Sequence, residues 1–134
     1  MNPPAGSRGI DDILAAARAK LRRVRPAEAY ARQRRGAILV DIRPVAQRTA
    51  TGEIPGALIV DRTVLEWRFD PRSPARLPVA DRYDLPVIVF CQQGYSSSLA
   101  AATLHDLGLH HATDMIGGFD AWAAAGLPHT GASA

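Results

Sequence analysis

Short apolar runs, each ending at a polar or reactive residue, constrain the fold of this chain more than any other sequence feature. Residues 37–41, 57–61 and 86–91 read Ala-Ile-Leu-Val-Asp, Ala-Leu-Ile-Val-Asp and Pro-Val-Ile-Val-Phe-Cys. Runs this short and continuously apolar are typical of strands that are buried on both faces of a sheet. Residues 112–116 form a weaker fourth run. We therefore expect a central sheet of about four to five short strands.

Helical stretches separate most of these runs. We expect helices over about residues 64–68, 96–107 and 119–125, and a long surface loop over the proline-rich residues 70–85. Buried strands that alternate with helices indicate a mostly parallel sheet with helices on both faces. The chain of 134 residues therefore predicts one α/β domain, which can bury a core without a disulfide or a metal.

The N-terminal part of the chain predicts two helices. Apolar residues recur at helical spacing over residues 10–24, with Lys and Arg on the opposite face. A second helix is expected over about residues 26–35, because proline fits its first turn and Gly36 follows its end. We therefore expect residues 1–25 to form a partly helical N-terminal extension and residues 26–130 to form the main domain.

The net charge of +3 is unevenly distributed along the chain. Residues 1–48 hold 11 of the 16 Lys and Arg residues and four acids, a net charge of +7, whereas residues 49–134 have a net charge of −4. A basic segment can bind nucleic acid, but no interleaved aromatic residues or nucleic-acid motif accompany this charge. We interpret the basic residues as a solvated helix face and expect no nucleic-acid partner.

Features of membrane and secreted proteins are missing from the sequence. No apolar run approaches the roughly 18 residues of a membrane span. The N-terminus has no basic region followed by an apolar core, and the single cysteine, Cys91, excludes an internal disulfide. These features predict a cytoplasmic protein without membrane contact.

Cys91 is the candidate nucleophile, because a buried strand ends at it and a helix is expected to begin shortly after it. Ligands bind at the carboxyl ends of parallel strands, and a helix N-terminus supplies unpaired N–H groups that stabilise a thiolate. Gly94 lets the backbone curl, and Ser96 and Ser97 can cap the helix and donate hydroxyl protons. The alternative is a small buried apolar cysteine. Five polar or glycine residues follow Cys91 directly, which favours a reactive thiol.

Two other arrangements of reactive residues fit the sequence less well. A metal site is suggested by His105, His110, His111 and Asp114. The adjacent histidines point apart on any regular element and no further ligand completes the set, so we expect surface histidines and no metal. A serine hydrolase triad is suggested by Ser96, Asp120 and His129. The second glycine of the nucleophile elbow is missing and the chain between the first and last members is too short, so hydrolase activity is not expected.

Six short segments within residues 35–129 resemble motifs of the rhodanese-like domain family. They are Val40-Asp41-Ile42-Arg43, Gly52-Glu53-Ile54-Pro55-Gly56-Ala57, Cys91-Gln92-Gln93-Gly94-Tyr95-Ser96-Ser97, Leu107-Gly108, Gly117-Gly118-Phe119-Asp120-Ala121-Trp122 and Gly126-Leu127-Pro128. The first resembles the family's Asp-x-Arg strand end. The second resembles its Gly-His-Ile-Pro-Gly-Ala turn with Glu53 in place of the usual His, and the third resembles its active-site loop. Each motif alone is weak, but their order makes the resemblance strong.

The resemblance implies a single-domain sulfurtransferase that needs no cofactor. Cys91 would take a sulfane sulfur from thiosulfate or a low-molecular-weight persulfide and hold it as a persulfide. A thiophilic acceptor, such as cyanide, a small thiol or a protein thiol, would then remove the sulfur. The loop residues that would surround the persulfide are Gln92, Gln93, Gly94, Tyr95, Ser96 and Ser97. The alternative is a non-catalytic rhodanese-like module for interaction or regulation, and either a monomer or a homodimer fits the sequence.

The candidate active-site loop departs from the family pattern in its charge. Many family loops place Arg or Lys beside the anionic donor, whereas Gln92, Gln93 and Tyr95 are uncharged. Asp41, Arg43 and Arg62 follow strand ends, so they are candidates for substrate binding or for a structural role. Related phosphatases have the pattern Cys-x5-Arg, and this chain has Ser97 at that position. Phosphatase activity is therefore not expected, because a phosphoryl group needs a guanidinium or a metal.

Overall fold

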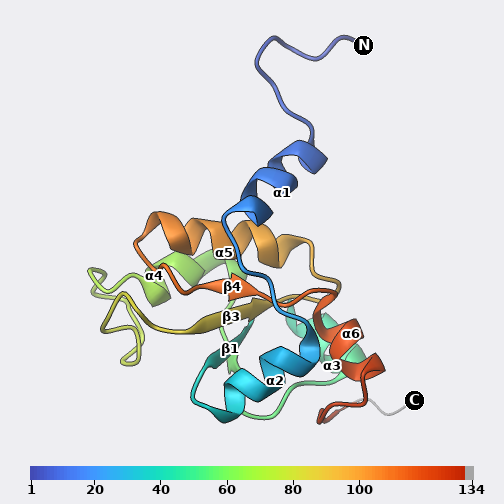
Figure 1. Ribbon diagram of the computed structural model, residues 1–134, viewed down its shortest axis with the longest axis vertical. Helices are drawn as coiled ribbons and strands as arrows, with labels where there is room; N and C mark the ends of the chain where they lie inside the picture. The colour runs from blue at the N-terminus through green and yellow to red at the C-terminus, as the bar shows by residue number, and fades with distance from the viewer. Residues whose placement is uncertain (132–134) are drawn as a thin grey trace.

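The computed structural model, which describes residues 1–131, consists of a parallel sheet between two layers of helices (Figure 1). The strands lie in the order β2-β1-β3-β4, and all three pairings are parallel. Their bounds are β1 Ile38–Asp41, β2 Leu58–Ile59, β3 Val87–Phe90 and β4 Thr113–Asp114. The predicted α/β class and parallel sheet are thus confirmed, with four strands.

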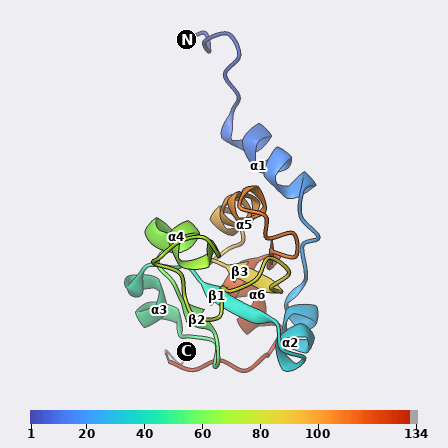
Figure 2. The same cartoon turned by 90° about the vertical axis from the view of Figure 1, so that its left-hand side faces the viewer.

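Helices cover both faces of the sheet (Figure 2). Their bounds are α1 Ile10–Ala19, α2 Pro26–Arg34, α3 Val45–Thr51, α4 Leu65–Phe69, α5 Ser96–Asp106 and α6 Gly118–Ala124, with a 3₁₀ turn at Arg62–Val64 before α4. Successive residues of β3 point to opposite faces. Val87 and Val89 pack in the core beneath α4 and α5, whereas Ile88 and Phe90 pack in the second core with Trp122 of α6. Cys91 belongs to the first core, on the α5 side of the sheet.

The first helix ends earlier than its apolar periodicity predicts. α1 stops at Ala19, and Val24 instead forms a parallel bridge with Met115 beside β4. The Val24 N–H donates to the Asp114 carbonyl at 3.1 Å. Val24 is therefore buried against the edge of the sheet and not on a helix face. α1 packs on α5 through Leu14 and Ala17, and its N-terminal end projects away from the sheet (Figure 1).

One helix was not expected from the sequence. α3 has no buried residue, so it lacks the apolar stripe on which helix prediction depends. Residues 70–85 contain no helix or strand, as expected. Among residues 1–131, no helix combines the length and the apolar character needed to cross a membrane.

Candidate active site

Cys91 lies where β3 ends, at the start of the segment 91–97 that leads into α5; we call this segment the cysteine loop. The residue is only 7% exposed, but it opens into a shallow depression of about 210 Å³. The other residues that line this depression are polar, namely Gln47, Gln92, Gln93, Tyr95 and Ser96. The Gly94 N–H donates to Cys91 Sγ at 3.2 Å. The sulfur is therefore accessible from a polar surface and in contact with a backbone donor.

The surroundings of Cys91 change its acidity in two opposing directions. Burial raises the pKa of the thiol, because it disfavours the charged form. Hydrogen bonds from the side chains of Ser97 and Ser96 and from the N–H groups of Ser97 and Gly94 lower the pKa. The hydrogen bonds outweigh burial, so the pKa of Cys91 lies below its ordinary value and the thiolate is favoured.

The curvature of the cysteine loop depends on glycines that pack against each other. Gly94 has φ +86°, and a Cβ on it would lie 2.6 Å from the Gly117 nitrogen. A Cβ on Gly118 would meet the Cys91 carbonyl oxygen at 2.4 Å. The N-terminal residues of α6 hold the loop from outside, since the Phe119 N–H donates to the Cys91 carbonyl at 2.9 Å. The two glycine segments therefore set the shape of the loop together.

We expect Gly94→Ala to destabilise the protein and to raise the pKa of Cys91. The added methyl group would push the loop away from Gly117, with an overpacking cost of about 1–3 kcal/mol. Gly36→Ala is the matched control, because Gly36 also has positive φ but its Cβ would meet nothing within 4 Å. Urea unfolding and the pH dependence of alkylation measure both effects. Equal unfolding midpoints and pH profiles for the two variants would contradict this account of the loop.

Arg43, one of the candidate substrate-binding residues, is enclosed by the protein and 2% exposed. All five of its guanidinium N–H donors have acceptors at 2.8 to 3.0 Å. The acceptors are both carboxylate oxygens of Asp41, the Gly52 carbonyl, Thr51 Oγ1 and Gln92 Oε1. The guanidinium also lies 4.3 Å from the centre of the Phe119 ring. No donor of Arg43 remains for a substrate, so we interpret Asp41 and Arg43 as structural residues that hold Gln92.

Arg62 lies away from the residues that line the depression. Its guanidinium pairs with Glu66 at 2.9 Å, and Glu66 also accepts a hydrogen bond from Thr103 of α5.

Gln92 and Gln93 are held by α6, because both side-chain amides donate to Asp120, at 2.7 and 3.4 Å. Of the three candidates Asp41, Arg43 and Arg62, the first two are therefore connected to the cysteine loop, because Arg43 binds both Asp41 and Gln92. Arg62 is not brought to the loop.

Three residues beside the cysteine loop were not identified as part of the site from the sequence. Asp114 is fully buried and accepts hydrogen bonds from the hydroxyls of Ser97 and Ser98, both at 2.8 Å. Arg18 and Arg23 both contact the Gly94 carbonyl. These partners are separated by more than 70 positions along the chain, and no local pattern predicts such contacts.

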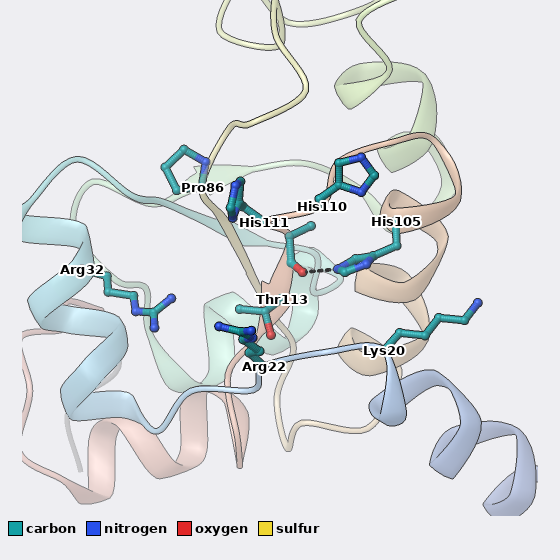
Figure 3. Close-up of a pocket in the computed structure, with 9 residues that line it drawn as sticks. Lys20, Arg22, Arg32, Pro86, His105, His110, His111 and Thr113 are labelled. Carbon is teal, nitrogen blue, oxygen red and sulfur yellow. Dashed lines mark hydrogen bonds between the residues drawn. The ribbon is translucent and has the colours of Figure 1, made fainter.

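The three candidate metal-binding histidines lie elsewhere, along a groove of about 380 Å³ beside Pro86, just before β3 begins (Figure 3). His105 Nε2 is 2.6 Å from the Ala112 carbonyl, whereas Asp114 contacts the cysteine loop. Within residues 1–131, no three His, Cys, Asp or Glu side chains are placed to hold a metal ion. His129 contacts the Leu127 carbonyl, so the structure gives no support to a triad with Ser96.

The fold and this site define a parallel α/β domain that presents one cysteine, at a strand end, to backbone and hydroxyl donors. Comparison with known proteins agrees with this description. The family model of the rhodanese-like domain matches residues 25–125. The thiosulfate sulfurtransferase GlpE of Haemophilus influenzae is 36% identical over 106 residues, which cover 78% of this chain and 90% of that protein. This chain therefore belongs to the rhodanese-like domain family.

Two solved structures extend the comparison to the N-terminal segment. A Rhodopseudomonas palustris protein of unknown function, described as a possible tyrosine phosphatase, is 34% identical with a TM-score of 0.84 and covers 97% of this chain and 100% of its own. The polysulfide-sulfur transferase homodimer of Wolinella succinogenes is 24% identical with a TM-score of 0.71 and covers 92% of this chain and 88% of its own. The second likeness concerns the fold alone.

Proposed function

We propose that this chain, a rhodanese-type sulfurtransferase, carries sulfane sulfur on Cys91 from a small donor to a thiophilic acceptor. The observation that carries the proposal is the position of Cys91, whose Sγ accepts the Gly94 N–H at 3.2 Å and which lines a depression together with polar side chains. The proposal assigns the reaction to residues 26–130, with residues 1–25 as an extension. It places the reaction in the cytoplasm, where acceptor thiols are kept reduced.

The proposed reaction has two displacement steps. In the first, the Cys91 thiolate attacks the outer sulfur of the donor, a new S–S bond forms and the donor's own S–S bond breaks. With thiosulfate, the electron pair of that bond leaves on sulfite. In the second, the acceptor attacks the terminal sulfur, and Cys91 leaves again as a thiolate. Both steps need a thiolate, and the N–H and hydroxyl donors of the cysteine loop can stabilise the negative charge in each state.

The uncharged depression bears on the choice of donor. No charged side chain is among the residues that line it, and Arg43 has no free donor. Thiosulfate carries two negative charges at neutral pH. It therefore needs more charge compensation around the reacting sulfur than a low-molecular-weight persulfide, which has a smaller charge there. The names of relatives such as the Haemophilus protein support thiosulfate as a donor. The loop itself favours a low-molecular-weight persulfide.

We expect kcat/KM to be higher for glutathione persulfide than for thiosulfate. The difference should be about tenfold or more, since a hydrogen bond to a charged group contributes roughly 1.5–3 kcal/mol. Steady-state assays with thiosulfate and with glutathione persulfide, each with a thiol acceptor, measure this ratio. A ratio of one or below would contradict the argument from loop charge while leaving sulfur transfer itself intact.

Mass spectrometry tests the proposed intermediate directly. After donor treatment, the protein should gain one sulfur atom, about 32 Da, and the adduct should map to Cys91. Incubation with a thiol acceptor should remove it. A protein that takes up sulfur from none of the donors would favour the alternative, a non-catalytic interaction module.

A phosphatase function, suggested by the description of the Rhodopseudomonas protein, has less support. The position that would carry the phosphate-binding arginine is Ser97, and its hydroxyl donates to Asp114. A phosphoryl group would therefore meet no guanidinium in the depression. An assay with p-nitrophenyl phosphate should give no Cys91-dependent hydrolysis.

The pH dependence of Cys91 alkylation should report the lowered pKa. Because the thiolate is the reactive form, the rate with iodoacetamide rises as the pH passes through the pKa of Cys91. The midpoint should lie below that of an unperturbed cysteine, because the hydrogen bonds to the sulfur outweigh the effect of burial on the pKa. The chain has one cysteine, so all labelling reports this residue. The urea-unfolded protein is the control, and a native midpoint equal to or above its midpoint would refute a stabilised thiolate.

A further inference from the structure

Two arginines from outside the matched residues 25–125 contact the cysteine loop at one atom. Arg18 belongs to α1, and Arg23 belongs to the connection between α1 and α2. Nη2 of each donates to the Gly94 carbonyl oxygen, at 2.8 Å from Arg18 and 3.0 Å from Arg23. The N–H of the same glycine donates to Cys91 Sγ. The residue that contacts the reactive sulfur is therefore held on its other side by two cations.

Further contacts connect these arginines to the first turn of α5. Arg18 Nε donates to Ser98 Oγ at 3.0 Å, and its guanidinium lies 5.6 Å from the centre of the Tyr95 ring. Arg23 forms a two-point ion pair with Asp114, at 2.8 Å through Nε and 3.2 Å through Nη2. Asp114 in turn accepts the hydroxyls that the first turn of α5 contributes. One polar network thus joins the N-terminal segment to the cysteine loop.

We propose that Arg18 and Arg23 are positioning residues for Cys91, which hold the Gly94 carbonyl and thereby fix the loop whose N–H groups surround the sulfur. The inference rests on the proposed function, since the position of Cys91 matters for sulfur transfer only if Cys91 reacts. It assigns a role to the N-terminal segment that carries the two arginines. α1 packs on α5, and Val24 pairs with Met115 beside β4, so this segment is held in place by both contacts.

The network also has an electrostatic consequence for the thiolate. Asp114 is a buried negative charge close to the cysteine loop, and without a partner it would oppose a second negative charge on the sulfur. Arg23 supplies the compensating charge. Ser97 has one hydroxyl proton, which both Cys91 and Asp114 Oδ2 can accept. The Asp114 carboxylate accepts this proton at 2.8 Å, and Arg23 balances the charge of that carboxylate through its own bond at 2.8 Å.

Other charged groups also contact the loop, so the test must separate their effects. The charged side chains in contact with it, from all the elements packed around it, are Arg18, Arg23, Arg43, Asp114 and Asp120. Only the first two come from the N-terminal segment. Arg43 and Asp120 contact the side chains of Gln92 and Gln93 and stay unchanged in the variants below.

The experiment measures the pH profile of iodoacetamide alkylation for full-length variants. Arg23→Gln and Arg18→Gln should each raise the midpoint by roughly 0.5–1 pH unit, so that the rate at neutral pH falls about three- to tenfold. Arg23→Gln/Asp114→Asn removes both charges and should return the midpoint toward that of the wild type. Arg18→Lys keeps the charge but not the two-point geometry, so its midpoint should lie between those of the wild type and Arg18→Gln.

Arg22→Gln is the matched control, because Arg22 lines the histidine groove (Figure 3), whereas the hydrogen bonds to the Gly94 carbonyl come from Arg18 and Arg23. It should leave the profile unchanged. Profiles of Arg18→Gln and Arg23→Gln that match the wild type, in protein with an unchanged unfolding midpoint, would overturn the proposal. A raised midpoint in Arg23→Gln that the Asp114→Asn change does not lower would overturn the charge argument. Alkylation needs no sulfur donor, so failure of sulfur transfer in the wild type would be seen separately.

Discussion

Cys91→Ser is expected to abolish sulfur transfer, with a loss of at least about a thousandfold in kcat/KM for every donor. A serine hydroxyl is far less acidic than a thiol and cannot form a persulfide, so neither displacement step remains. The chain offers no second cysteine to take over the role. Steady-state assays with thiosulfate or glutathione persulfide as donor, together with the mass of the donor-treated protein, measure the loss.

The same variant separates the catalytic from the structural contribution of Cys91. Serine is close in size to cysteine, and the Gly94 N–H and the neighbouring hydroxyls can donate to its oxygen as they do to sulfur. The unfolding free energy should therefore change by no more than about 1 kcal/mol. A Cys91→Ser protein that still accumulates a one-sulfur adduct would show that the sulfur is carried elsewhere.

The parts of this fold that could be predicted are those that depend on local sequence. A continuous apolar run predicts a buried strand, and the first polar residue after the run predicts where the strand ends. β1 and β3 follow that rule, and it places Cys91 at the carboxyl edge of the sheet before any contact is known. Helix α3 does not follow it, because a helix with no buried residue shows no apolar period.

Val24 shows why a correct period can still predict the wrong element. The residue is buried, as its apolar character indicates, and it lies at helical spacing from the apolar residues before it. Its burial comes from the bridge to Met115, a residue 91 positions later, and not from a helix face. Apolar periodicity predicts that a side chain is buried, but it does not predict which residues bury it.

The residues around the cysteine loop divide in the same way. The loop's glycine and serines are consecutive with Cys91, so their contact with the sulfur could be inferred from the turn itself. The contacts of Arg18 and Arg23 with Gly94 depend on how α1 and its connection cross α5 and β4, which no spacing rule encodes. For Arg43, sequence position left substrate binding and structure both open. The count of its hydrogen-bond acceptors favours the structural role.

That structural role predicts a large loss of stability in Arg43→Gln, about 3–5 kcal/mol in the free energy of unfolding. The substitution would leave the Asp41 carboxylate buried without its counter-ion and would remove the donor that holds Gln92. Chemical unfolding in urea measures the change. Arg62→Gln is the matched control, because the Arg62–Glu66 pair is partly exposed and should contribute only about 0.3–0.5 kcal/mol.

A double variant identifies the cause of the loss. If the cost comes mainly from the uncompensated charge, Arg43→Gln/Asp41→Asn should be more stable than Arg43→Gln alone, even though it has lost one more native side chain. The opposite order would mean that the Arg43 contacts with Thr51, Gly52 and Gln92 dominate, and that the ion pair contributes little. A substrate-binding Arg43 would behave differently from both: its loss would raise KM for an anionic donor and leave the unfolding free energy close to that of the wild type.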